Sequence, residues 1–599
     1  MATAAGAWRR WARKTRVALH GARVELVYSP RYYFQAPGLL LDPRRAIHLL
    51  AFLRRDGLLS RRLPPEPEPA SFDLLRQVHD DAYLEALQRP GTLGRAFGSM
   101  LPDDAEQEIL AVQRAMVGGT LAAARAALAA RGFAVNLGGG LHHARRDRGA
   151  GFCVLNDLAV AIAGLRRDGF AAPILIVDLD LHDGDGTRSL FADDPTVHTF
   201  SIHNQPWDEA GGVETTAIAL GSGVDDARLL AVLDRSLPPV VERFRPRLMF
   251  YLAGADVAAD DALGDWKMTA GGILARDLRI ADLARSRHLP CAITLAGGYG
   301  DHAWRYPARF VARLLLGREL EPPPTDELIL ERFRGVVRGV RREELSGEAT
   351  DEFFTAEDLG IPGAGPSRRR FLGFYTRAGI ELALERLGYL GRLRQLGYRE
   401  LEFELDLANP GGETLRIWGS PGRRELLVEL RARRDRSTLP GLELLAIEWL
   451  LLQNPRAEFT VGRPLLPGQS RPGLGMLRET ITALVLVCDR LHLDGIVVTP
   501  SRWHLARQAR QAFVSLHPED EGLFRSLEPV LSPLPLGEAT AAAVDGRVVD
   551  AATGVAVVWK PAPMVLPVSE RMKALLADPA REARVERHLR ALRLAAPAP

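Results

Sequence analysis

Short apolar runs alternate with longer stretches of helical period through the first half of the chain. Runs of about four to eight apolar residues predict buried strands, and helical stretches between them are typical of a parallel α/β sheet. We expect strands at 132–137, 173–181, 196–202, 247–253 and 291–296, and helices at 105–130 and 156–169. The pattern extends from Val24 to about Leu320 and predicts one α/β domain over residues 24–317.

A proline triplet interrupts this pattern and marks a linker at 318–326, because prolines fit neither helix nor strand interiors. The order of elements then changes, which predicts a second domain of α+β type at 327–599. Its expected elements are a helix at 371–393, strands at 400–407, 414–420, 425–432 and 495–500, an apolar run at 442–452, a hairpin at 546–559 and a charged C-terminal helix.

Composition limits the classes of partner. The 599 residues are 47% apolar and 25% charged, with a net charge of +2, so we expect a globular protein without direct nucleic-acid binding. The basic stretch 1–23 lacks the apolar core of a signal peptide and is interpreted as a solvated tail, and the run 442–452 is too short to span a bilayer. Three cysteines with no disulfide framework favour the cytoplasm.

Acidic and histidine side chains follow the expected strand at 173–181. Asp178, Asp180 and His182 are spaced by two residues and therefore project to one side. Functional groups of parallel sheets gather beyond the carboxyl ends of their strands, where Asp256 follows another strand. Two carboxylates and an imidazole suit zinc and leave a position open for water.

Two adjacent histidines, His142 and His143, follow a glycine run at the end of the strand at 132–137. Amide hydrolysis needs one proton taken from water and another given to the leaving nitrogen, and histidine can do both near neutral pH. Asp178 and Asp185 are available to orient the two imidazoles. Tyr299 follows the strand at 291–296, where its hydroxyl could stabilise an oxyanion.

These segments resemble the histone deacetylase superfamily, including its bacterial amidohydrolase-like members. GGGLHHARRDRGAGFCVLND is similar to the paired-histidine motif, DLDLHDGDGT to the metal motif, GADVAADDALGDWKMT to the third-ligand motif and LAGGYG to the tyrosine motif, in family order. VYSPRYYF and DRGAGFC look closest to class IV. The resemblance implies an arginase/deacetylase fold and hydrolysis of an acylated amine: acetyl-lysine or acyl-lysine in protein, or an acetylpolyamine.

The resemblance also implies residue roles, with zinc, or iron in its place, as the metal. His143 would be the general acid/base with Asp185 as its orienter, and His142 its electrostatic partner with Asp178. Tyr299 would polarise the carbonyl. The other implied residues are the metal ligands Asp180, His182 and Asp256, the acyl-channel residues Gly151 and Phe152, and a structural potassium site of Asp178, Asp180, His182, Ser201 and Ile202.

The sequence departs from the family pattern at two places. Asp183 stands where many members have a second histidine, but outside the catalytic set. The loop NQPWDEAGGVE replaces an aromatic-rich turn, which leaves the channel wall opposite Phe152 unassigned, with Trp207 as a candidate. Cys153 is interpreted as a packed thiol, and His198 and His203 as ordinary hydrogen-bonded histidines. A silent module that binds acylated proteins or polyamines and a ureohydrolase are the alternatives.

The element order of the second domain resembles the N-acetyltransferase (GNAT) fold. That family binds the pyrophosphate of acetyl-CoA with a glycine-bearing loop at a helix N-terminus. Gly473 and Gly475 fit the loop here, whereas Gln469 is displaced by one position and Pro472 removes an amide donor. An accessory α+β domain without transferase activity is the favoured interpretation, and acetyl-CoA binding is the alternative.

Overall fold

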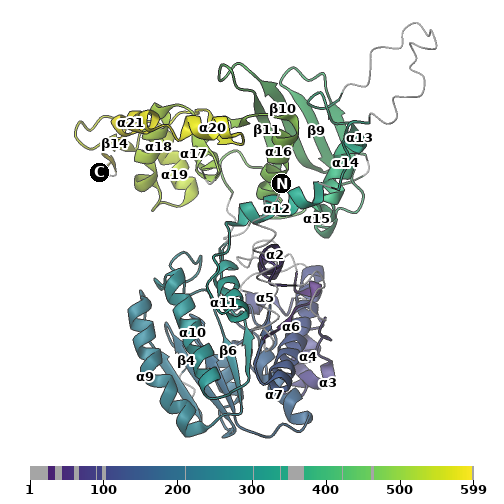
Figure 1. The fold of residues 1–599 in the computed structure, drawn as a ribbon, viewed down its shortest axis with the longest axis vertical. Helices are drawn as coiled ribbons and strands as arrows, with labels where there is room; N and C mark the ends of the chain where they lie inside the picture. Colours follow the sequence, from purple (N-terminus) through teal and green to yellow (C-terminus); the bar gives the residue numbers. More distant parts are fainter. Residues whose placement is uncertain are drawn as a thin grey trace, which may run out of the picture. The chain divides into compact units, whose positions relative to one another are not determined.

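Seven parallel strands form the sheet of the first half of the chain in the computed structural model (Figure 1). The five strands expected from the sequence are confirmed, and β1 and β5 complete the sheet. In spatial order they are β1 (Val24–Val27), β2 (Phe133–Asn136), β7 (Cys291–Thr294), β6 (Leu248–Leu252), β3 (Ile174–Asp178), β4 (Val197–His203) and β5 (Thr215–Ala219). The structure describes residues 24–33, 44–59, 66–89, 91–97, 103–208, 211–300, 302–337, 339–347, 370–420, 422–459, 465–510 and 512–595, so the predicted tail at 1–23 lies outside the described residues.

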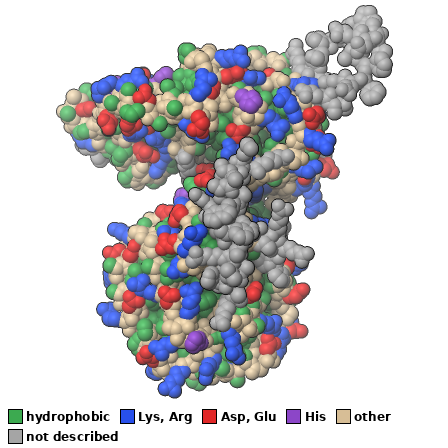
Figure 2. Space-filling model, viewed as in Figure 1, with side chains coloured by type: hydrophobic (Ala, Val, Ile, Leu, Met, Phe, Trp, Pro, Cys, Tyr) green, Lys and Arg blue, Asp and Glu red, His purple; other side chains and the backbone are tan. Residues whose placement is uncertain are grey.

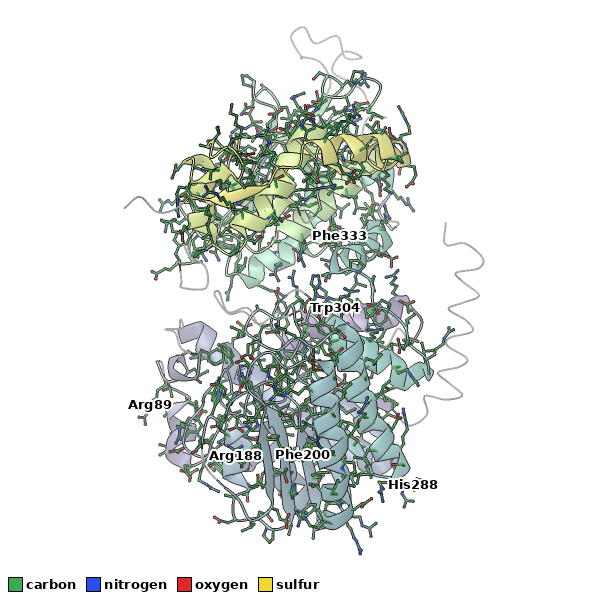
Figure 3. The ribbon with its side chains drawn as sticks, turned by 90° about the vertical axis from the view of Figure 1, so that its left-hand side faces the viewer. Arg89, Arg188, Phe200, His288, Trp304 and Phe333 are labelled. Carbon is green, nitrogen blue, oxygen red and sulfur yellow. The ribbon has the colours of Figure 1, made fainter. Side chains whose placement is uncertain are left out.

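Both faces of this sheet are covered by helices, as the buried strands at its centre require. One face packs against α2 (Arg45–Arg55), α9 (Asp226–Phe244), α10 (Ala270–Ser286) and α11 (Arg305–Leu316). The other packs against α3 (Phe72–Leu75), α4 (Asp81–Ala86), α6 (Asp103–Ala130) and α7 (Asp157–Arg167). The short elements are η1 (Pro30–Tyr32), α5 (Gly94–Phe97) and α8 (Asp185–Leu190). Phe200 and Trp304, labelled in Figure 3, are among the largest fully buried side chains.

The chain divides after Leu328 into two compact units, here called the first and second units. The segment 317–324 contains neither helix nor strand, and α12 (Thr325–Val337) begins inside the stretch predicted as a linker. In Figure 2, basic and acidic side chains are intermixed on the visible face of each unit, in keeping with the small net charge. None of the helices among the described residues has the length and apolarity to cross a bilayer.

A mixed seven-stranded sheet forms the second unit, in which β11 and β12 are parallel and the other pairs antiparallel. Its spatial order is β13 (Val514–Ser515), β15 (Met564–Pro567), β12 (Gly495–Val498), β11 (Leu444–Leu452), β10 (Leu426–Asp435), β9 (Glu413–Trp418) and β8 (Glu402–Asp406). Its helices after α12 are α13 (Arg342–Ser346), α14 (Arg377–Arg386), α15 (Tyr389–Gln395), α16 (Leu477–Leu491), α17 (Trp503–Ala509), α18 (Pro518–Leu531), α19 (Leu536–Val544), α20 (Glu570–Leu576) and α21 (Pro579–Arg587).

Two details of the second unit differ from the sequence prediction. The helix expected over 371–393 starts only at Arg377, capped by the Thr376 hydroxyl, and breaks at Gly388, whose φ of +79° lies in the left-handed region. The hairpin expected at 546–559 is present but short: Val549 and Ala556 form an antiparallel bridge, and the backbone N–H of Val557 donates to the carbonyl of Val548 at 2.8 Å. Its first arm, β14 (Val548–Asp550), also pairs with β16 (Leu592–Leu594), which the sequence did not predict.

Candidate active site

The candidate site lies where the carboxyl ends of β3, β6 and β7 meet in the middle of the parallel sheet. Asp178 ends β3, Asp180 and His182 follow it, Asp256 follows β6, and Tyr299 follows β7. These three strands are hydrogen-bonded neighbours, so the loops that leave them start side by side. The arrangement brings the predicted ligands to one point.

Asp180, His182 and Asp256 form a cluster whose ligand atoms all lie within 4.8 Å of one another. The two carboxylates are 1% and 0% exposed, so they are held together without water to screen their charges. Backbone amides fix them: Gly297 donates to Asp180 Oδ2 at 2.7 Å, and Leu181 donates to Asp256 Oδ1 at 3.0 Å. The other oxygens, Asp180 Oδ1 and Asp256 Oδ2, lie 3.3 and 3.0 Å from His182 Nδ1, so the two carboxylates and the imidazole converge on one point.

Glycines give the backbone room to approach this cluster. A Cβ atom on Gly254 would lie 2.5 Å from Asp180 Oδ2, and one on Gly297 would lie 2.4 Å from Asp256 Oδ2. Any larger residue would displace the carboxylates. The cradle is therefore built around the positions of the acid groups, as a preorganised ligand set requires.

The electrostatics of the cluster fit a bound cation. Burial and the charge of Asp180 raise the pKa of Asp256 well above its usual range. Burial opposes protonation of His182, but hydrogen bonds and charge interactions with Asp180 and Asp256 outweigh it and raise its pKa to about 10. Two buried carboxylates thus need a positive partner, and a divalent metal is a suitable one.

Two buried Asp–His pairs stand beside the cluster. Nδ1 of His142 is 2.8 Å from Asp178 Oδ2, and Nδ1 of His143 is 2.8 Å from Asp185 Oδ1. Burial lowers the pKa of His142, but Asp178 and Asp180 reverse this effect and raise it to about 9. Burial and the neighbouring His142 lower the pKa of His143 to about 4. At neutral pH, His142 therefore carries charge while His143 is neutral and can accept a proton.

Gly151, a predicted channel residue, packs closely against His143, and Phe152 follows it in the chain. Both have positive φ, +50° and +65°, and Phe152 lies 5.9 Å from the Tyr299 ring between centroids. Tyr299 is 8% exposed, and burial raises its pKa well above the usual range, so its hydroxyl stays protonated and able to donate. Gly151 thus contacts His143, and the Phe152 and Tyr299 rings lie next to each other.

Gly151→Ala is expected to lower kcat about 100-fold, because a Cβ there would lie 2.3 Å from His143 Cδ2 and push the imidazole out of place. Steady-state kinetics on an acyl-lysine substrate measures the effect. Gly169→Ala is the matched control, since Gly169 also has a positive φ, +92°, but nothing lies within 4 Å of its Cβ position. Equal activity of the two variants would contradict the packing of Gly151 against His143.

Trp207 is the candidate residue for the channel wall that the sequence analysis left unassigned. Its ring stacks on His143 with centroids 4.0 Å apart and an interplanar angle of 10°, and it remains 48% exposed. It also meets His182 edge-on, with centroids 5.9 Å apart. Trp207, the candidate residue of the altered loop, thus lies directly over His143 and covers one face of its imidazole.

A charged network that sequence reasoning missed anchors this loop. Asp183, which is fully buried, forms a two-pronged ion pair with Arg188 and accepts the backbone N–H of Trp207 at 3.0 Å. Arg145 joins Asp185 to Asp208, through Nη2 at 2.7 and 2.6 Å. The acid at position 183, where many family members have a histidine, could have indicated this network, because a buried acid needs a basic partner. Asp183 is thus not one of the three clustered ligand residues, but it holds the Trp207 loop in place.

The remaining predicted residues fall near the site with defined partners. Ser201 pairs with Asp178 across β4 and β3, and its hydroxyl lies 3.1 Å from His203 Nδ1, while Ile202 is buried on the same strand. His198 is hydrogen-bonded to Glu214 and Thr216, as expected of an ordinary buried histidine. Burial raises the pKa of the Cys153 thiol, which supports its interpretation as a packed side chain.

A family model for the histone deacetylase domain matches residues 40–315. Histone deacetylase 2 of Arabidopsis thaliana is 32% identical to the chain over 308 residues, which cover 79% of that protein and 49% of this one. The chain belongs to the histone deacetylase family. An uncharacterised protein of Picosynechococcus sp. is 37% identical and covered to 92%, with 46% of this chain, and the acetoin utilization protein AcuC of Staphylococcus aureus strain MSSA476 is 27% identical and covered to 86%, with 52% of this chain.

The match to the histone deacetylase family lies within the first unit. The superfamily resemblance and the parallel sheet predicted for an arginase/deacetylase fold are thereby confirmed, as is a separate unit with a mixed sheet. The class IV likeness and the GNAT likeness of the second unit stay predictions.

Proposed function

We propose that the first unit is a metal-dependent deacylase that hydrolyses the amide of an acylated amine. The observation that carries this proposal is the buried His143–Asp185 pair, 2.8 Å between Nδ1 and Oδ1, beside a buried cluster of two carboxylates and an imidazole. Zinc bound by Asp180, His182 and Asp256 would act as a Lewis acid for the acyl carbonyl and lower the pKa of a water molecule.

The side chains of the chain would handle the protons. Asp185 accepts the Nδ1–H of His143, which leaves Nε2 free to take a proton from water and later to give it to the departing amine. The positive charge of His142 lowers the pKa of His143. His143 would therefore take up a proton most readily when negative charge develops nearby during the reaction. The protonated Tyr299 hydroxyl would donate to the oxygen of the acyl carbonyl as negative charge develops there.

The two alternative functions predict different results on acylated substrates. A silent binding module would bind acyl-lysine peptides without turnover, and a ureohydrolase would release urea from guanidino compounds. Acetyl-lysine, longer acyl-lysines and acetylpolyamines all remain candidate substrates of the deacylase, and an acyl-lysine and acetylpolyamine series separates them. Trp207 stacks on His143 but is 48% exposed, so this wall sets no clear limit on the length of the acyl chain. The substrate series measures the preferred length.

Removal of the metal is expected to lower turnover at least 100-fold, and stoichiometric Zn²⁺ or Fe²⁺ should restore it. The measurement combines a fluorogenic acyl-lysine assay on chelator-treated protein with metal analysis of the purified chain. Asp256→Asn is the matched variant and should lose bound metal as well as activity. Full turnover by metal-free protein would sink the metal-dependent mechanism, whereas bound metal without turnover on any acylated amine would favour the silent module.

Further proposals follow for ions, compartment and the second unit. Asp178, Asp180, His182, Ser201 and Ile202 form our proposed potassium site, supported by the strand register that sets Ser201 beside Asp178. The three cysteines are free and buried, which supports the proposed cytoplasmic setting. Gly473 and Gly475 precede α16, as the GNAT-like loop would require, so acetyl-CoA binding stays an alternative to an accessory role.

A further inference from the structure

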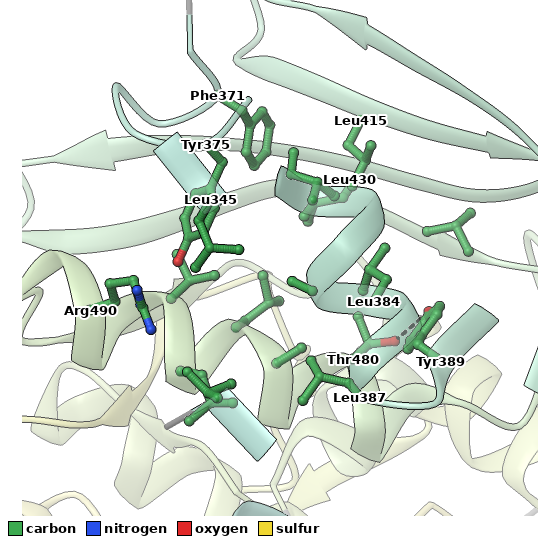
Figure 4. A pocket seen from close by; sticks show the side chains of 18 of the residues that line it. Leu345, Phe371, Tyr375, Leu384, Leu387, Tyr389, Leu415, Leu430, Thr480 and Arg490 are labelled. Atoms are coloured by element: carbon green, nitrogen blue, oxygen red, sulfur yellow. Dashed lines mark hydrogen bonds between the residues drawn. The ribbon is translucent and has the colours of Figure 1, made fainter. Parts of the chain in front are cut away.

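The second unit contains an apolar pocket between its sheet and the helices that pack against it (Figure 4). The pocket has a cavity volume of about 120 Å³, well above the roughly 10–15 Å³ that a single water molecule requires. Close-packed interiors rarely leave voids of this size. Most of its walls come from α14, β9, β10 and α16, and α12, α13 and α15 contribute one residue each.

Nearly all of the lining is aliphatic or aromatic. Leu415 and Leu430 line it from the sheet, Leu384 from α14 and Leu484 from α16. Two hydroxyl groups at one end, those of Thr480 and Tyr389, lie 2.9 Å apart and satisfy each other by a hydrogen bond. This part of the pocket therefore suits an apolar chain, because its two hydroxyl groups need no hydrogen-bond partner from a ligand.

Arg490 is the exception. It is the single charged residue of the lining, it is half-buried on the last turn of α16, and no acidic residue lines the pocket with it. The hydrogen bonds and ion pairs among the described residues include none to its guanidinium, whereas the adjacent Asp489 pairs with Arg334. Figure 4 shows Arg490 and the Tyr375 hydroxyl on the same side of the pocket, opposite the Thr480–Tyr389 pair.

A ligand that satisfies both features has an apolar chain and one anionic end. We propose that this pocket binds a medium- or long-chain carboxylate, with the chain among the aliphatic side chains and the carboxylate on Arg490. A guanidinium presents paired N–H groups that match the two oxygens of a carboxylate. Burial raises the pKa of Tyr375 to about 12, so its hydroxyl stays protonated as a second donor on that side.

Calorimetric titration of the full chain with octanoate, decanoate and dodecanoate tests this site. We expect one carboxylate per chain, with binding that strengthens about fourfold for each added methylene until the pocket is filled, because each buried CH₂ contributes a similar free energy. Decan-1-ol should bind about 10- to 100-fold more weakly than decanoate, since it lacks the charge-assisted bonds. Dodecyltrimethylammonium, which reverses the charge, should bind more weakly still.

Two variants place the bound carboxylate, and a third controls for charge. Arg490→Gln should weaken decanoate binding about 10- to 100-fold, and Ala483→Trp, which fills the pocket from α16, should abolish it. Arg386→Gln removes an equal charge from an exposed position on α14 and should leave binding unchanged.

Binding that Arg490→Gln leaves unchanged would overturn the carboxylate assignment, as would equal affinity for decanoate and decan-1-ol. Binding that survives Ala483→Trp would overturn the location, and so would the absence of heat with all three carboxylates. None of these results depends on deacylase activity, because the proposal concerns the second unit alone.

Discussion

His143→Ala is expected to lower kcat on an acylated amine by about 10³- to 10⁴-fold, the upper range for loss of a general acid/base. The reason is geometric and electrostatic. The imidazole is neutral, its Nδ1 is held by Asp185 at 2.8 Å, and its ring stacks on Trp207. Single-turnover kinetics with a fluorogenic acyl-lysine measures the loss without interference from product release.

The histidine at position 288 supplies the matched control. His288 is exposed at the surface of the same unit, labelled in Figure 3, and His288→Ala should leave kcat within about twofold. Metal content must stay at the level of the unmodified protein in both variants, because His143 is not one of the three clustered ligands. A loss of less than tenfold with metal retained would remove His143 from the proton-transfer role and require another base.

Much of the first unit could be predicted from the sequence because its signals are local. The runs that became β3 and β6 are largely apolar on both faces, and acidic or histidine residues follow each of them within four positions. The carboxyl ends of adjacent parallel strands meet by construction, so the convergence of Asp180, His182 and Asp256 followed from strand order alone. The family resemblance added the roles.

The contacts that hold the Trp207 loop could not be predicted in the same way. Whether Asp183 reaches Arg188, or Arg145 reaches both Asp185 and Asp208, depends on side-chain directions that spacing does not encode. The pairing of β14 with β16 is a similar case, since its strands lie some forty residues apart while the local pattern indicated only the hairpin. Nonlocal partners of this kind are decided by packing of the whole unit.

Asp183→Ala is expected to lower the free energy of unfolding of the first unit by about 3–5 kcal/mol, the cost of breaking a buried ion pair. The pair is deeply enclosed, with Asp183 at 0% and Arg188 at 4% exposure, so the variant leaves a guanidinium charge without its two-pronged partner. Denaturant unfolding measures the change. The backbone N–H of Trp207 also loses its acceptor, so kcat/KM should fall as the stacked wall over His143 loosens.

The double variant Asp183→Leu with Arg188→Met separates these two effects. Apolar residues of similar volume often replace a buried ion pair without loss of stability, so most of the unfolding free energy should return. The Trp207 N–H would still have no acceptor, so kcat/KM should stay below that of the unmodified protein. If activity returned together with stability, the Asp183 carboxylate would matter only as the partner of Arg188. If the single variant lost under 1 kcal/mol, the network would not anchor the loop.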